Sequence, residues 1–522
     1  MTNSSKFLPK QDSRSSSDPA ANAPSAESEA NKTVTKGAAQ PTFKAVSPFE
    51  LYYQMTYMSA MASAGLSRSR MFTAASQSSS TAASYFAAIN TLVNEFRYDY
   101  PEACRRIGTM AKSENMKSFL LRLSDTLRSG ESLPDFLTRE AGVQADDYQN
   151  DYERSLESLK QWTDAFSSIV ISVALIVIIQ VITSMVYSTD MTTMSSLIFT
   201  GLVMACFGAW IILRSTPKEQ MVGSAAKGSA EQRRSLSLFR IIVPVVVIGA
   251  VALYVVGVEL GYILMVGSAV LFPVGLVAAR SDGQLIKKDI EFATFLRSTG
   301  GMATSSGTTL KQALTKIDLT SFPTLEADIN RLSKRLQALV EPEVCWKKFG
   351  QESGSKLIAD VIDIFYGAVK MGGDPERVGY LCSLFTAKAV QLRAKRRLVS
   401  GTFTGLTSVM QGVVAGLMIF VLSIVQNFAA LIATLMPNDT DALSTTPSMS
   451  LGMAQFTAAD LQFLSTITLV MILALALVSA SAIIFCSGGF KLKVTMYTAL
   501  LIFLSGVAMI GVPPMVAKML VQ

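Results

Sequence analysis

The chain has 522 residues, half of them hydrophobic, and its 46 Lys and Arg against 39 Asp and Glu give a formal net charge of +7. It contains no histidine, which excludes Ser-His-Asp and Cys-His catalysis, histidine proton relays and mixed Cys/His zinc sites. Its five cysteines form no CxxC pair, so we interpret all five as small buried apolar groups. We expect no catalytic residue, no metal and no cofactor.

The first 47 residues are rich in Ser, Ala, Asn and Pro and have no apolar face. Such a composition buries too little apolar surface to offset the entropy lost on folding, so residues 1–47 are predicted to be a disordered tail. The tail also lacks the apolar stretch of a secretory signal peptide, so the sequence does not imply export.

Seven long apolar runs follow the tail, and crossing a bilayer takes roughly 20 apolar residues per helix. No soluble core needs so many runs of this length. The sequence therefore predicts an all-α polytopic membrane protein with about seven transmembrane helices. The runs cover residues 166–187, 194–213, 241–257, 260–279, 407–435, 462–486 and 495–517.

Two soluble segments separate these runs, and both have helical periodicity. Apolar residues recur at three- and four-residue spacing in 115–128 and again in 357–370. Gly130 and the glycine pair at 372–373 mark the helix ends that follow. Each soluble segment is therefore predicted to be a helical bundle.

The predicted domain order alternates these bundles with membrane spans. No break is expected at 160–166 or at 398–408, so each bundle should run directly into a transmembrane helix. The predicted parts are a disordered cytoplasmic tail at 1–47, a first cytoplasmic helical domain at 48–165, transmembrane helices 1 and 2 at 166–213, a basic cytoplasmic loop at 214–240, transmembrane helices 3 and 4 at 241–279, a second cytoplasmic helical domain at 280–402, and transmembrane helices 5 to 7 at 403–522.

The distribution of Lys and Arg among the short loops predicts the orientation. Loops 214–240 and 487–494 are basic, whereas loops 188–193, 258–259 and 436–461 contain no Lys or Arg. Because Lys and Arg are retained on the cytoplasmic side, we expect the N-terminus and both soluble domains in the cytoplasm of a multi-pass cell-membrane protein.

A short motif occurs twice, as PEACRRIG at 101–108 and as PEVCWKKFG at 342–350, where Trp346 is an additional residue. A shift of 242 positions aligns further landmarks of the two soluble domains and the starts of the first and fifth spans. We therefore predict two duplicated cytoplasmic helical bundles. The aligned positions are Gly65 with Gly307, Gly108 with Gly350, Arg128 with Lys370, Gly130 with Gly372, and Phe166 with residue 408.

The two copies carry opposite net charge. Residues 48–165 hold 12 basic and 15 acidic residues, a net of −3, and residues 280–402 hold 19 basic and 13 acidic residues, a net of +6. Folds of opposite sign can pair with each other or face two different partners, and both alternatives remain open.

Two candidate sites of chemistry are weak. GQESGSKL at 350–357 has three residues between its glycines where a phosphate-binding loop has four, and Leu357 stands where a Ser or Thr should hold magnesium. A helix junction explains this stretch better. Asp360 and Asp363 share a helix face without histidine or cysteine nearby, which favours a solvated edge over a metal site.

The spans contain no charged residue of the kind that marks an ion or substrate path. Gly412 and Gly416 would permit close helix packing, and the prolines in GVPP at 511–514 would kink or end the last helix. The polar exceptions, which can bond between helices, are Gln180, Gln411, Gln426 and Asn427.

Two segments of the second domain are candidates for partner binding. LRAKRRLVSG at 392–401 would hold topology and touch anionic lipid heads, or would dock an acidic cytoplasmic partner. MGGDPERVG at 371–379 would form a sharp turn with Asp374 capping the next helix, and this corner could lie against a partner.

Three stretches carry a resemblance to a known family: FLRSTGGMATSSGTTLKQALTKID at 295–318, CWKKFGQESGSKLIADVIDIFYGAVKMGGDPERVG at 345–379 and LRAKRR at 392–397. With the duplicated soluble domain, they resemble the type II secretion F-domain family of pilus platform proteins, which includes TadC-like members. Within it they look like the archaeal flagellum (archaellum) assembly protein J branch, FlaJ/ArlJ. The resemblance is strongest across 280–430 and weaker across 48–187.

The resemblance implies a non-enzymatic assembly platform beneath a filament of pilin-like subunits, driven by a cytoplasmic hexameric ATPase. It also implies a homodimer, contact with membrane lipid, and no nucleic-acid partner. The ATPase-facing role would fall on Gly372, Gly373, Asp374, Arg393, Lys395, Arg396 and Arg397.

Alternatives remain within and outside this family. The filament could be an archaellum, an adhesive pilus, a DNA-uptake pilus or part of a secretion system. A secondary transporter would need a buried charge or an inverted repeat, but the first and fifth spans make this repeat parallel. A lipid-bound signalling scaffold would need a sensor or output domain, which the sequence does not contain.

Overall fold

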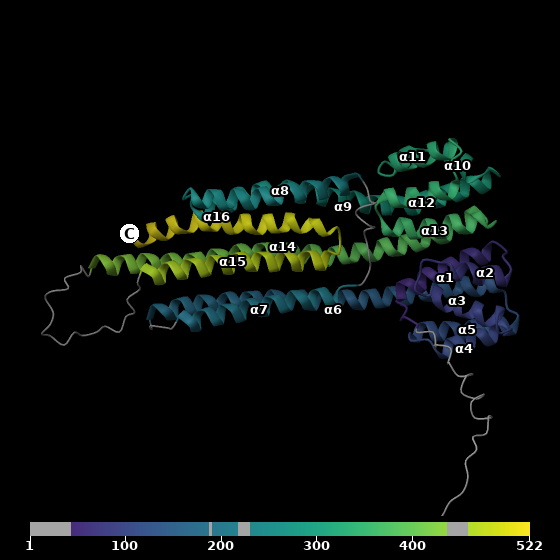
Figure 1. Cartoon of the computed structure of the whole chain (residues 1–522), viewed down its shortest axis with the longest axis horizontal. Helices are drawn as coiled ribbons and strands as arrows, with labels where there is room; N and C mark the ends of the chain where they lie inside the picture. Colours follow the sequence, from purple (N-terminus) through teal and green to yellow (C-terminus); the bar gives the residue numbers. More distant parts are fainter. Residues whose placement is uncertain (1–42, 187–190, 218–229, 436–457, 522) are drawn as a thin grey trace, which may run out of the picture. The chain divides into compact units, whose positions relative to one another are not determined.

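The computed structural model describes residues 43–186, 191–217, 230–435 and 458–521, and in these ranges the chain forms sixteen α-helices, two short 3-10 helices and no β-strand (Figure 1). Residues 44–522 form one compact unit. Seven helices within the described ranges are long and apolar enough to cross a membrane. The predicted fold class, an all-α polytopic membrane protein, is confirmed.

The apolar helices include three that are far longer than a bilayer requires, namely α6, α9 and α14, with 54, 46 and 61 residues. Each runs without a break from an apolar span into the soluble part of the chain. The continuity predicted at 160–166 and at 398–408 is confirmed, and α9 adds a third continuous helix. The seven are α6 (Leu133–Val186), α7 (Met191–Ser215), α8 (Ala230–Val255), α9 (Leu260–Ser305), α14 (Pro375–Leu435), α15 (Ala458–Ser487) and α16 (Val494–Val521).

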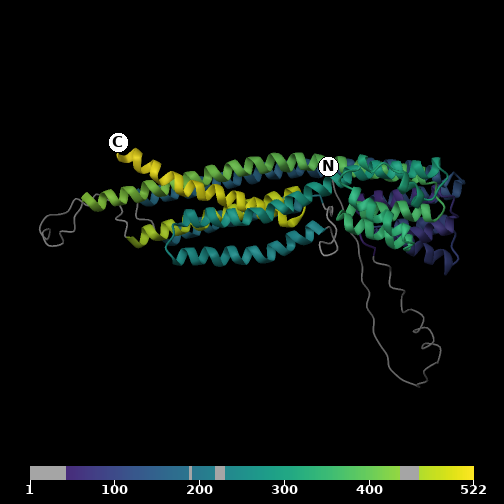
Figure 2. The ribbon, with the colours of Figure 1, turned by 90° about the horizontal axis from the view of Figure 1, so that it is seen from above.

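The shorter helices gather at one end of α6, α9 and α14 (Figures 1 and 2). The first bundle packs α1 against the part of α6 that precedes its apolar span, and the second packs α13 and the end of α9 against the start of α14, with α10 packed on α9. The first bundle contains α1 (Pro48–Ser63), α2 (Arg68–Ser76), α3 (Ala83–Asn94), α4 (Tyr100–Thr109) and α5 (Glu114–Ser129), and the second α10 (Leu310–Lys316), η1 (Leu319–Ser321), α11 (Glu326–Gln337), α12 (Pro342–Ser353) and α13 (Lys356–Lys370); η2 (Lys491–Lys493) joins α15 to α16.

Local signals in the sequence explain where these helices begin and end. The helix predicted over 115–128 is α5, and Gly130 ends it in the left-handed conformation at φ 76°. The helix predicted over 357–370 is α13, which begins after Ser355, whose hydroxyl accepts the N–H of Ile358 at 3.4 Å. Pro375 is the first residue of α14, as predicted.

The two bundles share one backbone register. Helices α2, α4, α5 and α6 begin 242 residues before α10, α12, α13 and α14. The left-handed residues repeat at the same offset, even where neither copy has glycine, and this agreement supports the duplication. The left-handed pairs are Gly65 and Gly307, Gly130 and Gly372, and Arg97 and Leu339, the last two both at φ 60°.

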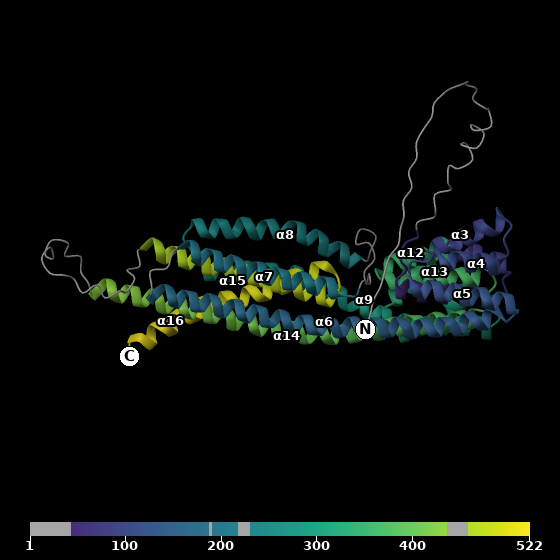
Figure 3. The ribbon, with the colours of Figure 1, turned by 90° about the horizontal axis from the view of Figure 1, so that it is seen from below.

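Helices α6 and α14 run side by side and join the two bundles (Figure 3). Lys388 lies 3.3 Å from Asp146, and Lys395 lies 2.5 Å from Glu153. Both pairs join residues 242 positions apart in the sequence, so equivalent positions of the two copies face each other. The opposite charges of the copies are thus used, at least here, to pair the copies with each other.

Glycines allow α9 to approach its neighbours closely at two levels. A Cβ at Gly300 would overlap the carbonyl oxygen of Pro375 at the start of α14, and one at Gly379 would lie 2.7 Å from the carbonyl oxygen of Leu296. Nearer the other end of α9, a Cβ at Gly275 would overlap the backbone of Met496 in α16. These contacts fix α9 against α14 in the second bundle and against α16 in the spans.

Several boundaries and local expectations differ from the structure. Residues 230–240 of the predicted basic loop are helical and begin α8. The last helix continues through Pro513 and Pro514 to Val521, so the prolines do not end it, and prolines within membrane helices are tolerated in general. No described atom lies within 4 Å of a Cβ at Gly412 or Gly416, so these glycines make no close packing within the described chain.

Other predictions from the sequence fall partly on residues that the structure does not describe. The tail prediction lies outside the described residues for 1–42, but Val46 is buried and Tyr85 donates a hydrogen bond to the carbonyl of Lys44 at 2.9 Å. The end of the predicted tail therefore packs on the first bundle. Residues 187–190, 218–229 and 436–457, in three of the predicted loops, also lie outside the described ranges.

Candidate functional site

The residues predicted to face a partner lie in two separate places on α14. Gly372, Gly373 and Asp374 stand at its N-terminal end, whereas Arg393 to Arg397 lie about five turns further on. At 1.5 Å of rise per residue, the two places are about 30 Å apart. The structure therefore does not bring the predicted residues together into one site.

The N-terminal place is a turn between α13 and α14, which we call the corner (residues 371–377). Gly372 has φ 97°, and Gly373 lies so close to α13 that a Cβ would be 2.9 Å from the carbonyl oxygen of Ala368. The carboxylate of Asp374 accepts the hydroxyl of Thr304 at 2.8 Å and the N–H of Arg377 at 3.3 Å. The corner therefore ties α9 to α14.

An open groove of about 440 Å³ lies beside the corner. Three of the residues that line it, Arg297, Arg377 and Tyr380, were not predicted from the sequence. The guanidinium of Arg297 lies 4.9 Å from the ring centroid of Tyr380, which is 48% exposed. Arg377 is exposed at the same groove. Exposed Arg and Tyr are typical of the side chains that anchor protein interfaces.

The basic cluster at 393–397 is mostly engaged within the chain. Arg393 is 7% exposed and forms an ion pair of 2.8 Å with Asp289 of α9. Lys395 bonds Glu153 of α6. Arg396 is 1% exposed and donates to the carbonyls of Cys486 at 2.9 Å and Phe485 at 3.2 Å.

Arg396 thereby satisfies carbonyls at the C-terminal end of α15, where a cation is also favoured by the helix dipole. Only Arg397 of the four is exposed and forms no ion pair among the described residues. The ATPase-facing role of these four residues stays a prediction, and the burial of Arg393 and Arg396 within the chain argues against that role for these two.

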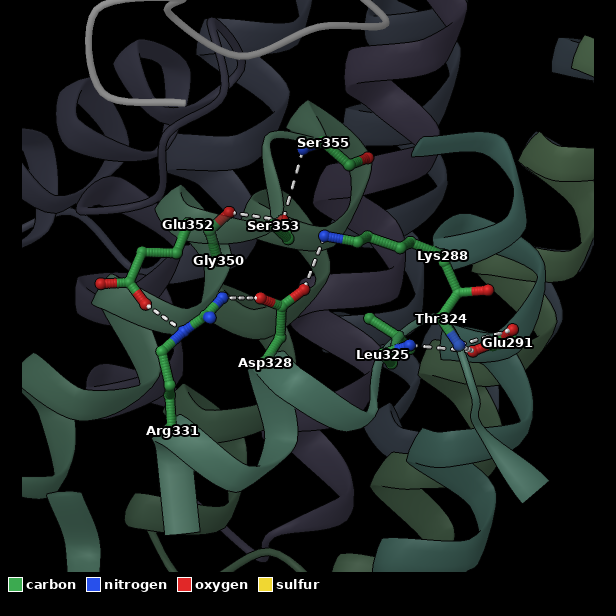
Figure 4. Close-up of polar contacts among 10 residues, drawn as sticks. All are labelled: Lys288, Glu291, Thr324, Leu325, Asp328, Arg331, Gly350, Glu352, Ser353 and Ser355. Atoms are coloured by element: carbon green, nitrogen blue, oxygen red, sulfur yellow. Dashed lines mark hydrogen bonds and ion pairs between the residues drawn. The ribbon is translucent and has the colours of Figure 1, made fainter. Parts of the chain in front are cut away.

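Charged side chains also hold the second bundle together (Figure 4). Asp328 of α11 is 3% exposed and pairs with Lys288 of α9 at 2.7 Å and with Arg331. Glu352 of α12 lies 3.4 Å from Arg331 and 2.6 Å from Arg335. We call these residues the α11 ion network, and it links α9, α11 and α12.

Neither weak candidate for chemistry gains support from the geometry. Gly350 lies inside α12 against Ala359, and Gly354 ends α12 at φ 80°, so the GQESGSKL stretch is a helix junction as predicted. Asp360 is buried and pairs with Lys356, whereas Asp363 is exposed. Asp360 therefore departs from the solvated edge that was predicted for both carboxylates.

Four of the five cysteines are buried, as predicted, and Cys206 in α7 is exposed. Burial raises the pKa of the Cys104 thiol to about 12, which keeps it protonated and unreactive at neutral pH. No group of three or more His, Cys, Asp or Glu residues that could hold a metal ion occurs within the described part of the chain.

One part of the chain is similar to a known protein family. Residues 55–181 match the family described as type II secretion system (T2SS), protein F. The match covers the first bundle and its span, whereas the sequence resemblance was strongest across 280–430. The predicted resemblance to type II secretion F proteins is confirmed for this part of the chain, and seven helices within the described residues are long and apolar enough to cross a membrane.

Two curated relatives give the more particular similarity. The chain is 27% identical over 316 residues to the flagella accessory protein J of Methanocaldococcus jannaschii, a match covering 58% of this chain and 56% of the relative. It is 24% identical over 340 residues to the flagella accessory protein J of Methanococcus voltae, covering 63% and 60%. The chain is thus a homologue of these proteins, although it spans less than two thirds of their length. No solved structure matches it.

Proposed function

We propose that this chain is the non-enzymatic membrane platform of an archaellum or a related type IV pilus-like filament. In this role it couples a cytoplasmic hexameric ATPase to the insertion of pilin-like subunits or to rotation of the filament. The observation that carries the proposal is the continuity of α6, α9 and α14 from the soluble bundles into the spans. The similarity to proteins named flagella accessory protein J supports it.

Three unbroken helices make a mechanical connection between bundle and span. A 61-residue helix such as α14 is about 90 Å long, roughly three times the thickness of the hydrocarbon core of a bilayer, so a large part of it extends out of the membrane into the bundle. Displacement of a bundle therefore moves its spans without first unfolding a linker. An active site is not needed for this work, because the ATPase supplies the energy.

The orientation and the duplication are parts of the same proposal. The basic loops support an orientation with the N-terminus and both bundles in the cytoplasm, where an ATPase would reach them. The shared 242-residue register supports descent of both bundles from one unit. In this proposal the ancestral unit was a bundle whose last helix entered the membrane. A second copy of the whole chain is a further expected partner.

We place the ATPase contact at the corner and its groove rather than at the basic cluster. Gly372 and Asp374 are exposed there, and Arg297, Arg377 and Tyr380 surround them. The corner begins α14, so a force applied to it acts along the axis of a helix that continues into the membrane. Of the four basic residues at 393–397, only Arg397 and the half-exposed Lys395 are accessible.

Co-purification of the full-length protein with its ATPase tests this placement. We expect Arg377→Glu, combined with Tyr380→Ala, to abolish co-purification, because both side chains are exposed and both line the groove. Membrane insertion should be unchanged. A matched control is Arg128→Glu, which reverses an exposed arginine near the equivalent turn of the first bundle.

Two results would count against the proposal. Normal ATPase binding by the double variant would remove the corner from the contact. Failure of the wild-type protein to bind any secretion-type ATPase, in membranes that assemble filaments, would remove the coupling role itself.

A further inference from the structure

A cavity of about 350 Å³ lies between α9, α14 and the turn that joins α15 to α16. Ala279, the last residue of the fourth predicted span, contributes to its wall, as do Thr404 at the start of the fifth and Tyr497 at the start of the seventh. The cavity is therefore at the level where three helices leave the membrane. Lipid phosphate groups occupy the same depth.

The cavity exists because the facing helices present glycine to each other. Gly283 of α9 and Gly401 of α14 both line it, and no described atom lies within 4 Å of a Cβ at either position. On both sides of this level α9 is packed too tightly for a Cβ, at Gly275 against α16 and at Gly300 against α14. The open space is thus confined to the membrane surface.

The wall of the cavity has an excess of positive charge. Asp282 pairs with Lys493 at 3.2 Å, and Asp289 pairs with Arg393 at 2.8 Å, so each carboxylate is already matched by a cation. Arg397 lines the same wall, is exposed and has no ion pair among the described residues. An anion in the cavity would therefore meet an unmatched guanidinium.

A buried hydroxyl in the wall also lacks a partner. The side-chain oxygen of Ser487, at the end of α15, makes no hydrogen bond to any described residue. A buried hydroxyl without a partner is unfavourable, and an anionic oxygen would accept a hydrogen bond from it. Ser487 and Arg397 supply donors from two different helices.

An exposed stripe of glycines begins at the cavity and continues into the spans. Gly405, Gly412 and Gly416 follow Gly401 on one face of α14, and a Cβ at any of them meets no described atom within 4 Å. Val409 and Val413 beside this stripe are 68% and 55% exposed. The stripe is therefore a smooth apolar surface that starts where the cavity opens.

We propose that this cavity binds the phosphate headgroup of an anionic phospholipid, with an acyl chain lying along the glycine stripe of α14. Arg397 pairs with the phosphate, and Ser487 donates a hydrogen bond to it. A free phosphate ion would use the charge but not the stripe, and for this reason we commit to a lipid. The site is independent of the proposed function, although its assignment to the cytoplasmic leaflet rests on the proposed orientation.

Lipid retention by the full-length protein tests the proposal. The protein is purified in detergent, supplied with phosphatidylglycerol or with phosphatidylcholine, and assayed for bound phospholipid and for its melting temperature. We expect phosphatidylglycerol to be retained and to raise the melting temperature, because a ligand that binds only the folded state stabilises it. Phosphatidylcholine should do neither.

Two variants and one control locate the site. Gly401→Leu fills the cavity, and Arg397→Gln removes the unmatched cation from an exposed position where folding is not at risk. We expect Arg397→Gln to weaken retention of phosphatidylglycerol about fivefold, as loss of one cation near an anionic lipid surface predicts. Gly401→Leu should weaken retention as well, because it occupies the space of the headgroup. Lys491→Gln removes an exposed cation from the same turn outside the cavity and should change nothing.

A separate arm distinguishes the two sources of phosphate. Inorganic phosphate, at about 10 mM as a probe in excess, should neither displace phosphatidylglycerol nor raise the melting temperature, since it lacks the acyl chain. Displacement by inorganic phosphate would overturn the lipid assignment. Equal retention of phosphatidylglycerol by Arg397→Gln and the wild type would overturn the site.

Discussion

At position 86 the first bundle buries a phenylalanine, and at the equivalent position 328 the second bundle buries an aspartate. Lys288 and Arg331, which pair with Asp328, have the equivalents Val46 and Ile89 in the first bundle, and both are buried. The same place in the fold is therefore apolar in one copy and ionic in the other.

The difference shows which features define this fold. The helix starts, the glycine turns and the left-handed residues are common to both copies, whereas the chemistry of the core is not. A buried ion pair adds little stability over well-packed apolar residues, because desolvation offsets most of the attraction. The charges of Lys288, Asp328 and Arg331 pair with one another inside the second bundle, and this part of the charge of the second copy is therefore unavailable to a partner.

The largest expected effect comes from removing Asp328, the buried carboxylate of the α11 ion network. Asp328→Ala leaves Lys288 without its carboxylate in a nearly buried position, and we expect a loss of about 3–5 kcal/mol of unfolding free energy. Converting the core to the chemistry of the first copy, with Lys288→Val, Asp328→Phe and Arg331→Ile together, should recover most of that loss. Thermal unfolding followed by fluorescence of Trp346, which is buried in the same bundle, measures both.

Phe86→Ala is the matched control in the first bundle. It removes a fully buried ring from an apolar core, and the cavity that it leaves should lower the free energy of unfolding by about 3–5 kcal/mol. If the triple conversion is less stable than Asp328→Ala, then the two cores are not interchangeable and the comparison fails.

Replacing the two equivalent left-handed glycines with valine tests whether the two turns have the same role in filament assembly. Gly130→Val and Gly372→Val force a β-branched residue into positive φ, and each should cost about 1–3 kcal/mol. We expect filament assembly to fall much further for Gly372→Val, because only that turn forms the proposed ATPase contact. Filament counts by electron microscopy, with melting temperatures in parallel, give the answer. Equal losses for both variants would assign no special role to the corner.

Charge reversal between the copies should have a smaller effect. Lys395→Glu sets two carboxylates against each other between α6 and α14, and we expect a lower melting temperature than wild type. Adding Glu153→Lys restores an opposite-charge pair with its ends exchanged and should recover the loss. Both shifts should shrink in high salt, because the two side chains are partly exposed. A double variant no better than the single one would show that the pair does not couple the helices.

The smallest effect concerns an exposed pair that only the second copy has. A hydrogen bond from Lys370 lowers the pKa of Glu343 below its usual 4.5, whereas Arg128, equivalent to Lys370, forms no ion pair among the described residues. A carboxylate with a lowered pKa adds stability above its unfolded pKa and loses it as pH falls through the folded value. The melting-temperature difference between wild type and Glu343→Gln should therefore be small at neutral pH and vanish as the pH falls through the lowered pKa of Glu343. A melting-temperature difference that persists below that pKa would come from packing of the Glu343 side chain and not from its charge.

Much of the architecture could be predicted because it depends on local patterns. The apolar runs gave the spans, and helix ends at Gly130 and Asp374 follow from the conformations that glycine and capping residues favour. The 242-residue offset was visible in a few landmarks. In each case the sequence signal and the structural feature lie within a few residues of each other.

The state of the basic cluster could not be predicted in the same way. The partners of Arg396 are backbone carbonyls of Phe485 and Cys486, about 90 positions away, and a backbone acceptor leaves no mark in the sequence. Asp289, which neutralises Arg393, is 104 positions away on another helix. The groove residues Arg297 and Tyr380 were missed for the same reason, since only the tertiary fold stacks one on the other.

The two ion pairs between α6 and α14 have a consequence for the history of the chain. Each sets a residue opposite its own counterpart in the other copy. A single-copy ancestor that paired with itself through this face would have placed identical side chains together, acid on acid or base on base. Fusion into one gene lets each half mutate separately, so that repulsion becomes attraction and the wrong partner is rejected by its sign.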